Sequence, residues 1–105
     1  MIWSPQLDAD QSYVPGAARL MSDSRATHYW DPQMLVGNAF RGIVHADQPL
    51  WDFWMLFDRT ARWKDAAPPA PAWWEHQLRG LPEERHLEPD RFGRMAARLL
   101  DSSAP

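Results

Sequence analysis

The feature that most constrains this chain is a nearly unbroken apolar run over residues 51–57, Trp-Asp-Phe-Trp-Met-Leu-Phe. A strand with one wet face would alternate apolar and polar side chains, whereas this run is apolar at almost every position. A continuous run is typical of a strand in a sheet that helices cover on both faces. We therefore predict an α/β domain with this strand at its centre and with Trp54 and Phe57 buried.

Composition limits the size and class of the protein. Its 105 residues suffice for one domain, 1–105, and seven Trp, four Phe and two Tyr supply apolar area that so short a chain needs. The net charge of −3 and the pI near 5.7 give no basic surface for nucleic acid or an anionic membrane. The lack of cysteine excludes disulfides, thiol redox chemistry and thiolate metal sites. With neither a secretion leader nor a membrane-spanning stretch evident, we expect a cytoplasmic protein.

Strand and helix signals alternate along the chain. Asp31 and Pro32 are suited to the cap and first position of a helix. The apolar spacing of residues 92–100 predicts an amphipathic helix that begins near Pro89. The expected elements, in order, are a strand stub at 1–5, a helix at 13–21, a strand at 25–30, a helix at 32–44, a strand at 51–57 forming a hairpin with 62–64, a Pro-rich connector at 66–72, a helical turn at 73–78, a helix at 89–100 and a flexible tail at 101–105.

This order resembles the thioredoxin fold from its second strand onward. Trp3 after the stub, Pro15 in the next helix and Pro49 before the buried strand are similar local features. The chain is also similar to the carboxyl-terminal part of uncharacterised, cysteine-free bacterial thioredoxin-like proteins, through Trp30-Asp31 and Trp51-Asp52-Phe53-Trp54. The resemblance implies an amino-terminally truncated thioredoxin-like domain, in which one mixed sheet has helices on both faces.

The same resemblance implies a module without redox activity. Redox members have Trp-Cys-x-x-Cys where this chain has Trp3-Ser4-Pro5-Gln6-Leu7. Pro49 lies further from the end of the buried strand than the family's cis-proline, so the isomer of the Gln48–Pro49 bond stays open. Ten Arg against one Lys indicate a GC-rich bacterial gene. We also conjecture an environmental or mobile-element origin, such as an integron cassette.

An alternative is a small enzyme or metal-dependent protein that uses Asp8, Asp10 and His28 with an aromatic-lined pocket. The two aspartates lie in the loop that holds the reactive cysteines in redox members. Helix capping explains them more simply, because acidic side chains favour the positive end of a helix. We therefore predict no catalytic residue and no cofactor.

A shared metal site is also disfavoured by distance. The pairs His28 with Asp31 and His45 with Asp47 flank a predicted helix that is about 20 Å long at 1.5 Å per residue. One ion cannot bridge that distance, and we predict no metal. We interpret Glu75 and His76 as solvated side chains.

Tryptophan supplies the candidate residues for ligand or partner binding: Trp3, Trp30, Trp73 and Trp74. Paired exposed aromatics are common at interfaces and in pockets, but Trp73 and Trp74 would serve equally well as a lid over a small core. A chain without the family's first strand would leave strand edges and apolar faces uncovered. We therefore expect a homodimer formed through an apolar, Trp-rich surface, and we also consider a protein partner.

Overall fold

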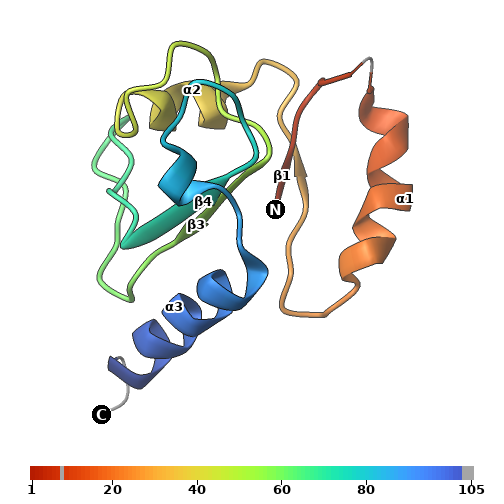
Figure 1. Ribbon diagram of the computed structural model, residues 1–105. Coiled ribbons are helices and arrows are strands. Elements are labelled where there is room, and N and C mark those ends of the chain that lie inside the picture. The colour runs from red at the N-terminus through yellow and green to blue at the C-terminus, as the bar shows by residue number, and fades with distance from the viewer. Residues whose placement is uncertain (8, 103–105) are drawn as a thin grey trace.

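The computed structural model describes residues 1–7 and 9–102 and shows a mixed α/β domain (Figure 1). Strands and helices alternate through the first half of the chain, and a hairpin and a long helix make up the second half. The elements are β1 (Ile2–Trp3), the 3-10 helix η1 (Gln11–Tyr13), α1 (Val14–Ala18), the 3-10 helix η2 (Arg19–Met21), β2 (Tyr29–Trp30), α2 (Leu35–Arg41), β3 (Phe53–Leu56), β4 (Trp73–His76), the 3-10 helix η3 (Glu83–Arg85) and α3 (Pro89–Ser102).

The strands form two small sheets, and the expectation of one mixed sheet is wrong for the described residues. β1 pairs with β2 in parallel, so that Trp3 lies opposite Trp30. β3 pairs with β4 in antiparallel register, with Trp54 opposite Glu75. Each of β1 and β2 has only two residues, and neither pairs with the hairpin among the described residues.

The partner of β3 differs from the one expected. The predicted hairpin joined 51–57 to 62–64, and residues 73–78 were expected to make a helical turn. Instead residues 73–76 form the second strand, and Lys64 makes only an isolated bridge to Ala67. Aromatic side chains favour strands because they pack across a pleated surface. The ring of Trp74 stacks on that of Phe53 with centroids 5.0 Å apart.

The first helical segment is short and lies at the surface. Asp10 caps η1, since its Oδ1 accepts a hydrogen bond from the backbone N–H of Ser12 at 2.8 Å. Pro15 lies in the first turn of α1, as predicted, where its missing N–H leaves no bond unmade. No residue of η1, α1 or η2 is buried.

Asp31 caps α2 although it precedes the first helical residue, Leu35, by four positions. Its two carboxylate oxygens accept hydrogen bonds from the N–H groups of Leu35 and Val36, each at 2.9 Å. The capping role is as predicted, but Pro32 lies in the preceding turn and not in the first helical position. The helix predicted to reach residue 44 ends at Arg41, and turns follow at residues 42–45. The N–H of Ala46 donates to the carbonyl oxygen of Arg41, and His45 has a left-handed backbone.

The core lies between α2 and one face of the hairpin. Its buried side chains are Phe40, Val44 and Leu50, and the half-buried side chains that pack on them are Val36, Ile43, Ala46, Phe53, Met55, Trp74, Leu78 and Leu81. α3 covers the other face through its contact with β4 (Figure 1). Helices therefore lie on both faces of the hairpin.

The burial predicted for the central strand is incomplete. All four residues of β3, including Trp54, are half-buried. Phe57 is 38% exposed and lies after the strand, so its predicted burial is wrong. A two-stranded hairpin has no second neighbour to cover the free edge of β3, and a single helix on each face leaves part of each β3 side chain accessible.

α3 is the element that its sequence predicts best. Phe92, Met95, Ala96 and Leu99 are half-buried along one face, whereas Leu100 is 74% exposed. In Figure 1 the carboxyl end of α3 extends beyond the hairpin. Asp101 and Ser102 are helical and not part of a tail, and residues 103–105 lie outside the described residues. Within the described ranges, the helices are too short or too polar to cross a membrane.

The remaining connections lie between the regular elements. The Gln48–Pro49 peptide bond is trans. Of the connector predicted at 66–72, residues 68–72 lie outside helices and strands, whereas Ala66 lies in a turn and Ala67 forms a bridge to Lys64. The connector leads into β4 and not into the predicted helical turn. The strand expected at 25–30 is shorter than predicted, because only Tyr29 and Trp30 pair with β1.

Candidate functional site

The most buried polar groups in the described part of the chain are neighbours in β4. Glu75 is 0% exposed and His76 is 1% exposed, lower values than those of any core apolar side chain. Successive side chains of a strand point to opposite faces, so Glu75 faces α3 with Trp73, and His76 faces the core side with Trp74. The interpretation of Glu75 and His76 as solvated is wrong.

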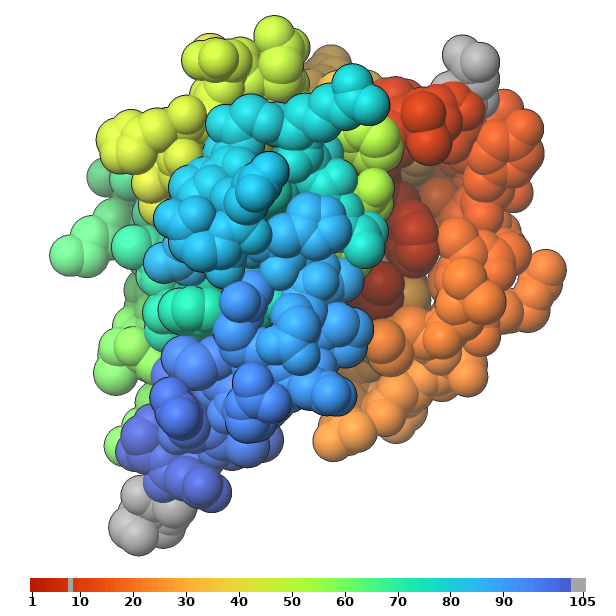
Figure 2. Space-filling model, in the orientation of Figure 1, coloured from red at the N-terminus to blue at the C-terminus, as the bar shows by residue number. Residues whose placement is uncertain are grey.

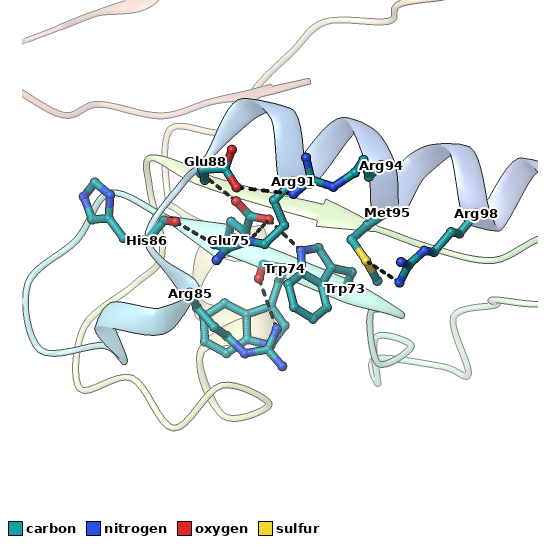
Figure 3. A network of polar contacts seen from close by, with 10 residues as sticks. All are labelled: Trp73, Trp74, Glu75, Arg85, His86, Glu88, Arg91, Arg94, Met95 and Arg98. Carbon is teal, nitrogen blue, oxygen red and sulfur yellow. Dashed lines mark hydrogen bonds and ion pairs between the residues drawn. The ribbon is translucent and has the colours of Figure 1, made fainter.

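The carboxylate of Glu75 joins β4 to α3 (Figure 3). Its Oε2 accepts hydrogen bonds from Trp73 Nε1 at 2.7 Å and from Arg91 Nε at 3.1 Å. Its Oε1 accepts one from the backbone N–H of Glu88 at 2.7 Å. Arg91 also donates from Nη2 to the carbonyl oxygen of His86 at 2.8 Å. Three donors thus fix a single buried carboxylate in one position.

These contacts determine the ionisation of Glu75. Burial raises the pKa of the carboxyl group, whereas Arg91, the Glu88 amide and Trp73 lower it, and the net effect is a pKa below the usual value. The pKa of Arg91 is raised in turn by its hydrogen bond to Glu75. A carboxylate held in its charged form by three donors is suited to a structural role and poorly suited to general base catalysis.

Both ring nitrogens of His76 are occupied. The N–H of Leu78 donates to Nδ1 at 2.9 Å, so Nδ1 is the acceptor of a neutral ring. Nε2 then carries the hydrogen and donates to the carbonyl oxygen of Pro82 at 2.8 Å. His76 therefore holds the turn after β4 against η3.

Arg85 lies across the outer edge of β4 and contacts both tryptophans. Its guanidinium carbon is 4.7 Å from the ring centroid of Trp73 and 4.4 Å from that of Trp74. Its Nη1 donates to the carbonyl oxygen of Trp74 at 3.1 Å. A guanidinium over an aromatic face is attracted by the negative charge density of the ring. Figure 3 shows Arg85 and Arg91 on different sides of the Trp73 ring.

The four tryptophans proposed as binding residues form two separate pairs. Trp74 packs on the core, and the N–H of the Trp73 indole is used inside the Glu75 network. Both are half-buried, so they cover the hairpin more than they extend from it. Trp3 and Trp30 lie opposite each other in the β1–β2 sheet.

The residues of the alternative enzyme site have structural partners. Trp3 Nε1 donates to His28 Nδ1 at 3.0 Å, and His28 Nε2 lies 3.0 Å from the carbonyl oxygen of Met21. Asp10 is engaged by Ser12, whose hydrogen bonds lower the pKa of Asp10. Asp8 lies outside the described residues. Across residues 1–7 and 9–102, no group of three or more potential ligands is placed to hold a metal ion.

The chain was compared with protein-family models, with curated proteins and with solved structures, and none of them matches it. Inference about function therefore rests on the geometry of the chain itself.

Proposed function

We propose that this protein is a non-redox binding or assembly module with a thioredoxin-like arrangement, and that it acts as a homodimer. The observation that carries the proposal is the exposure of large apolar side chains on the amino-terminal half. Leu20 is 88% exposed and Leu7 is 84% exposed. Exposed apolar side chains that lie together on one surface are typical of a site that binds a partner.

Of the eleven large apolar side chains that are exposed among the described residues, seven lie in the first 30 residues. In the first 30 residues they are Met1, Ile2, Leu7, Tyr13, Leu20, Met21 and Tyr29. Figure 2 shows this part of the chain, red to orange, along one side of the molecule. No side chain of β1, α1 or β2 is buried. Because the described residues among the first 30 contribute no buried side chain to the core, a second copy is the simplest source of the missing apolar contacts.

The order and pairing of the elements support the thioredoxin-like part of the proposal. A parallel β1–β2 pair is joined through α1, and an antiparallel hairpin is followed by α3. In the view of Figure 1, the β1–β2 pair lies between α1 and the hairpin. The chain has no cysteine, and we expect no activity in an insulin-reduction assay.

A binding role is favoured over the enzyme alternative. Asp10 and His28 are engaged in capping and in the contact between β1 and the loop before β2. No contact among the described residues brings these two side chains together. A cytoplasmic location and a mobile-element origin stay predictions.

Light scattering coupled to size exclusion tests the dimer. We expect a mass of twice 12.2 kDa at micromolar concentration, with a concentration-dependent shift to monomer on dilution. Leu20→Arg should favour the monomer, because it places a charge in the apolar surface. Leu100→Arg is the matched control, since Leu100 is 74% exposed on α3. A folded wild-type monomer at all concentrations would contradict the proposal.

A further inference from the structure

Arg85 is a cation that lies over two aromatic rings and has no anionic partner among residues 1–7 and 9–102. Its guanidinium lies over two indole rings and uses Nη1 to hold the carbonyl oxygen of Trp74. The ion pairs of the described residues join Arg25 to Asp23, Arg91 to Glu75 and Arg94 to Glu88, and none includes Arg85. Its positive charge is therefore left uncompensated by any ion pair within the described chain.

The contrast with Arg91 shows what is missing at Arg85. Both arginines contact the Trp73 ring, Arg85 at 4.7 Å and Arg91 at 5.9 Å from its centroid. Arg91 has a carboxylate, that of Glu75, whereas the acceptor of Arg85 within the described part of the chain is a neutral carbonyl oxygen. The Nε and Nη2 groups of Arg85 remain as a pair of donors with no hydrogen-bond acceptor among the described residues.

We propose that Arg85 is an oxyanion-binding residue, which takes a carboxylate or phosphate group of a ligand at the Trp73–Trp74 edge of β4. A guanidinium presents its N–H donors in a planar fork that matches two oxygens of such a group. The indole rings already fix the plane of the fork, so little further conformational entropy is lost when an oxyanion binds. Trp73 is half-buried, so the accessible part of its ring adjoins Arg85 and can contact the rest of the ligand.

Neighbouring charges set the strength expected of this site. η3 carries Glu83 and Glu84 beside Arg85 in the sequence, and both are exposed. Their negative charges oppose a bound anion, although solvent and salt screen this effect. A free oxyanion should therefore bind weakly, and a ligand that also contacts Trp73 should bind more tightly. The site lies on the hairpin and not on the amino-terminal surface, so it does not depend on the proposed dimer.

Nuclear magnetic resonance titration of the full chain tests the site. Acetate and inorganic phosphate are added separately, and sodium chloride at the same ionic strength is the reference. We expect saturable shifts of the Arg85 Nε–H signal and the Trp73 and Trp74 indole N–H signals with one or both oxyanions. Shifts with acetate alone identify a carboxylate ligand, and shifts with phosphate alone identify a phosphate ligand. Shifts no larger than those in chloride overturn the proposal.

Two variants separate specific binding from general attraction. Arg85→Lys keeps the charge but loses the fork, and should weaken oxyanion binding by about tenfold, while Arg94→Lys should leave it unchanged. Glu84→Gln removes an opposing charge without altering the stack, and should tighten binding by about twofold at low salt. Because Glu84→Gln leaves the network intact, it remains informative if Arg85→Lys does not fold.

Unchanged or weaker binding by Glu84→Gln, or full binding by folded Arg85→Lys, would contradict the assignment. Repeating the titration with Leu20→Arg shows whether the result is independent of oligomeric state.

Discussion

Glu75 Oε1 accepts a hydrogen bond from the backbone N–H of Glu88 at 2.7 Å, and this bond attaches the beginning of α3 to the hairpin. The first N–H groups of a helix have no partners within it. A carboxylate at this end both accepts such a bond and interacts favourably with the helix dipole. Glu75 therefore acts as a cap supplied from another element, 13 residues away in the sequence.

Replacing this carboxylate should destabilise the protein. Glu75→Gln keeps the shape of the side chain but turns one acceptor oxygen into an amide donor, which leaves part of the buried network unpaired. We expect a loss on the order of 2–3 kcal/mol in the free energy of unfolding, measured by urea denaturation. Glu84→Gln is the control and should change it by less than about 0.5 kcal/mol, because Glu84 is exposed. Equal effects of the two variants would show that the network does not hold α3.

Stability should also fall as the pH is lowered. The pKa of Glu75 is below its ordinary value of 4.5, and those of Asp10, Asp23 and Asp58 are below 3.8. A group whose pKa is lower in the folded state contributes stability above its unfolded pKa and loses it as the pH falls through the folded pKa. We therefore expect little change above pH 4.5 from these groups and a decrease below it. Glu75→Gln should show a shallower decrease in urea titrations across this range.

The sequence predicts the local features of this fold better than its long-range pairing. The cap at Asp31 and the apolar face of α3 follow from neighbours within a few residues, and the structure contains both. The partner of β3 depends on a pairing across a long loop, which the pattern at 62–64 does not reveal. The aromatic pair Trp73-Trp74 is a signal for a strand, because such residues favour strands, and the helical turn predicted at 73–78 neglects it.

The polar centre at Glu75 was missed for a similar reason. A glutamate is usually exposed unless it is paired, and its partners Glu88 and Arg91 are 13 and 16 residues away. The local sequence signal for the burial of Glu75 is the alternation of side chains in β4, which places Glu75 on the same face as Trp73. Once residues 73–76 are recognised as a strand followed by an amphipathic helix, an inward glutamate and an arginine in the first turn of that helix predict an ion pair.

His45 offers a test of backbone strain at the end of the α2 region. It is exposed and has a φ of 57°, in the left-handed region that favours glycine. His45→Gly should relieve this strain and raise the free energy of unfolding by about 0.5 to 1 kcal/mol, after allowance for the greater freedom of glycine in the unfolded chain. His45→Ala keeps the strain and should give no gain. A gain from alanine equal to that from glycine would contradict a left-handed position.

Two glycines of the α2 region should respond in opposite directions to alanine. A Cβ atom on Gly37 would lie 2.5 Å from the carbonyl oxygen of Leu50, a contact with backbone that cannot turn aside, whereas nothing lies within 4 Å of one on Gly42. Gly37→Ala should therefore separate α2 from Leu50 and cost about 1–3 kcal/mol. Gly42 has a helical backbone with φ of −67°, so Gly42→Ala should stabilise by up to about 1 kcal/mol. Urea denaturation of both variants gives the two signs directly, and a stabilising Gly37→Ala would mean that Leu50 does not pack against α2 as the structure places it.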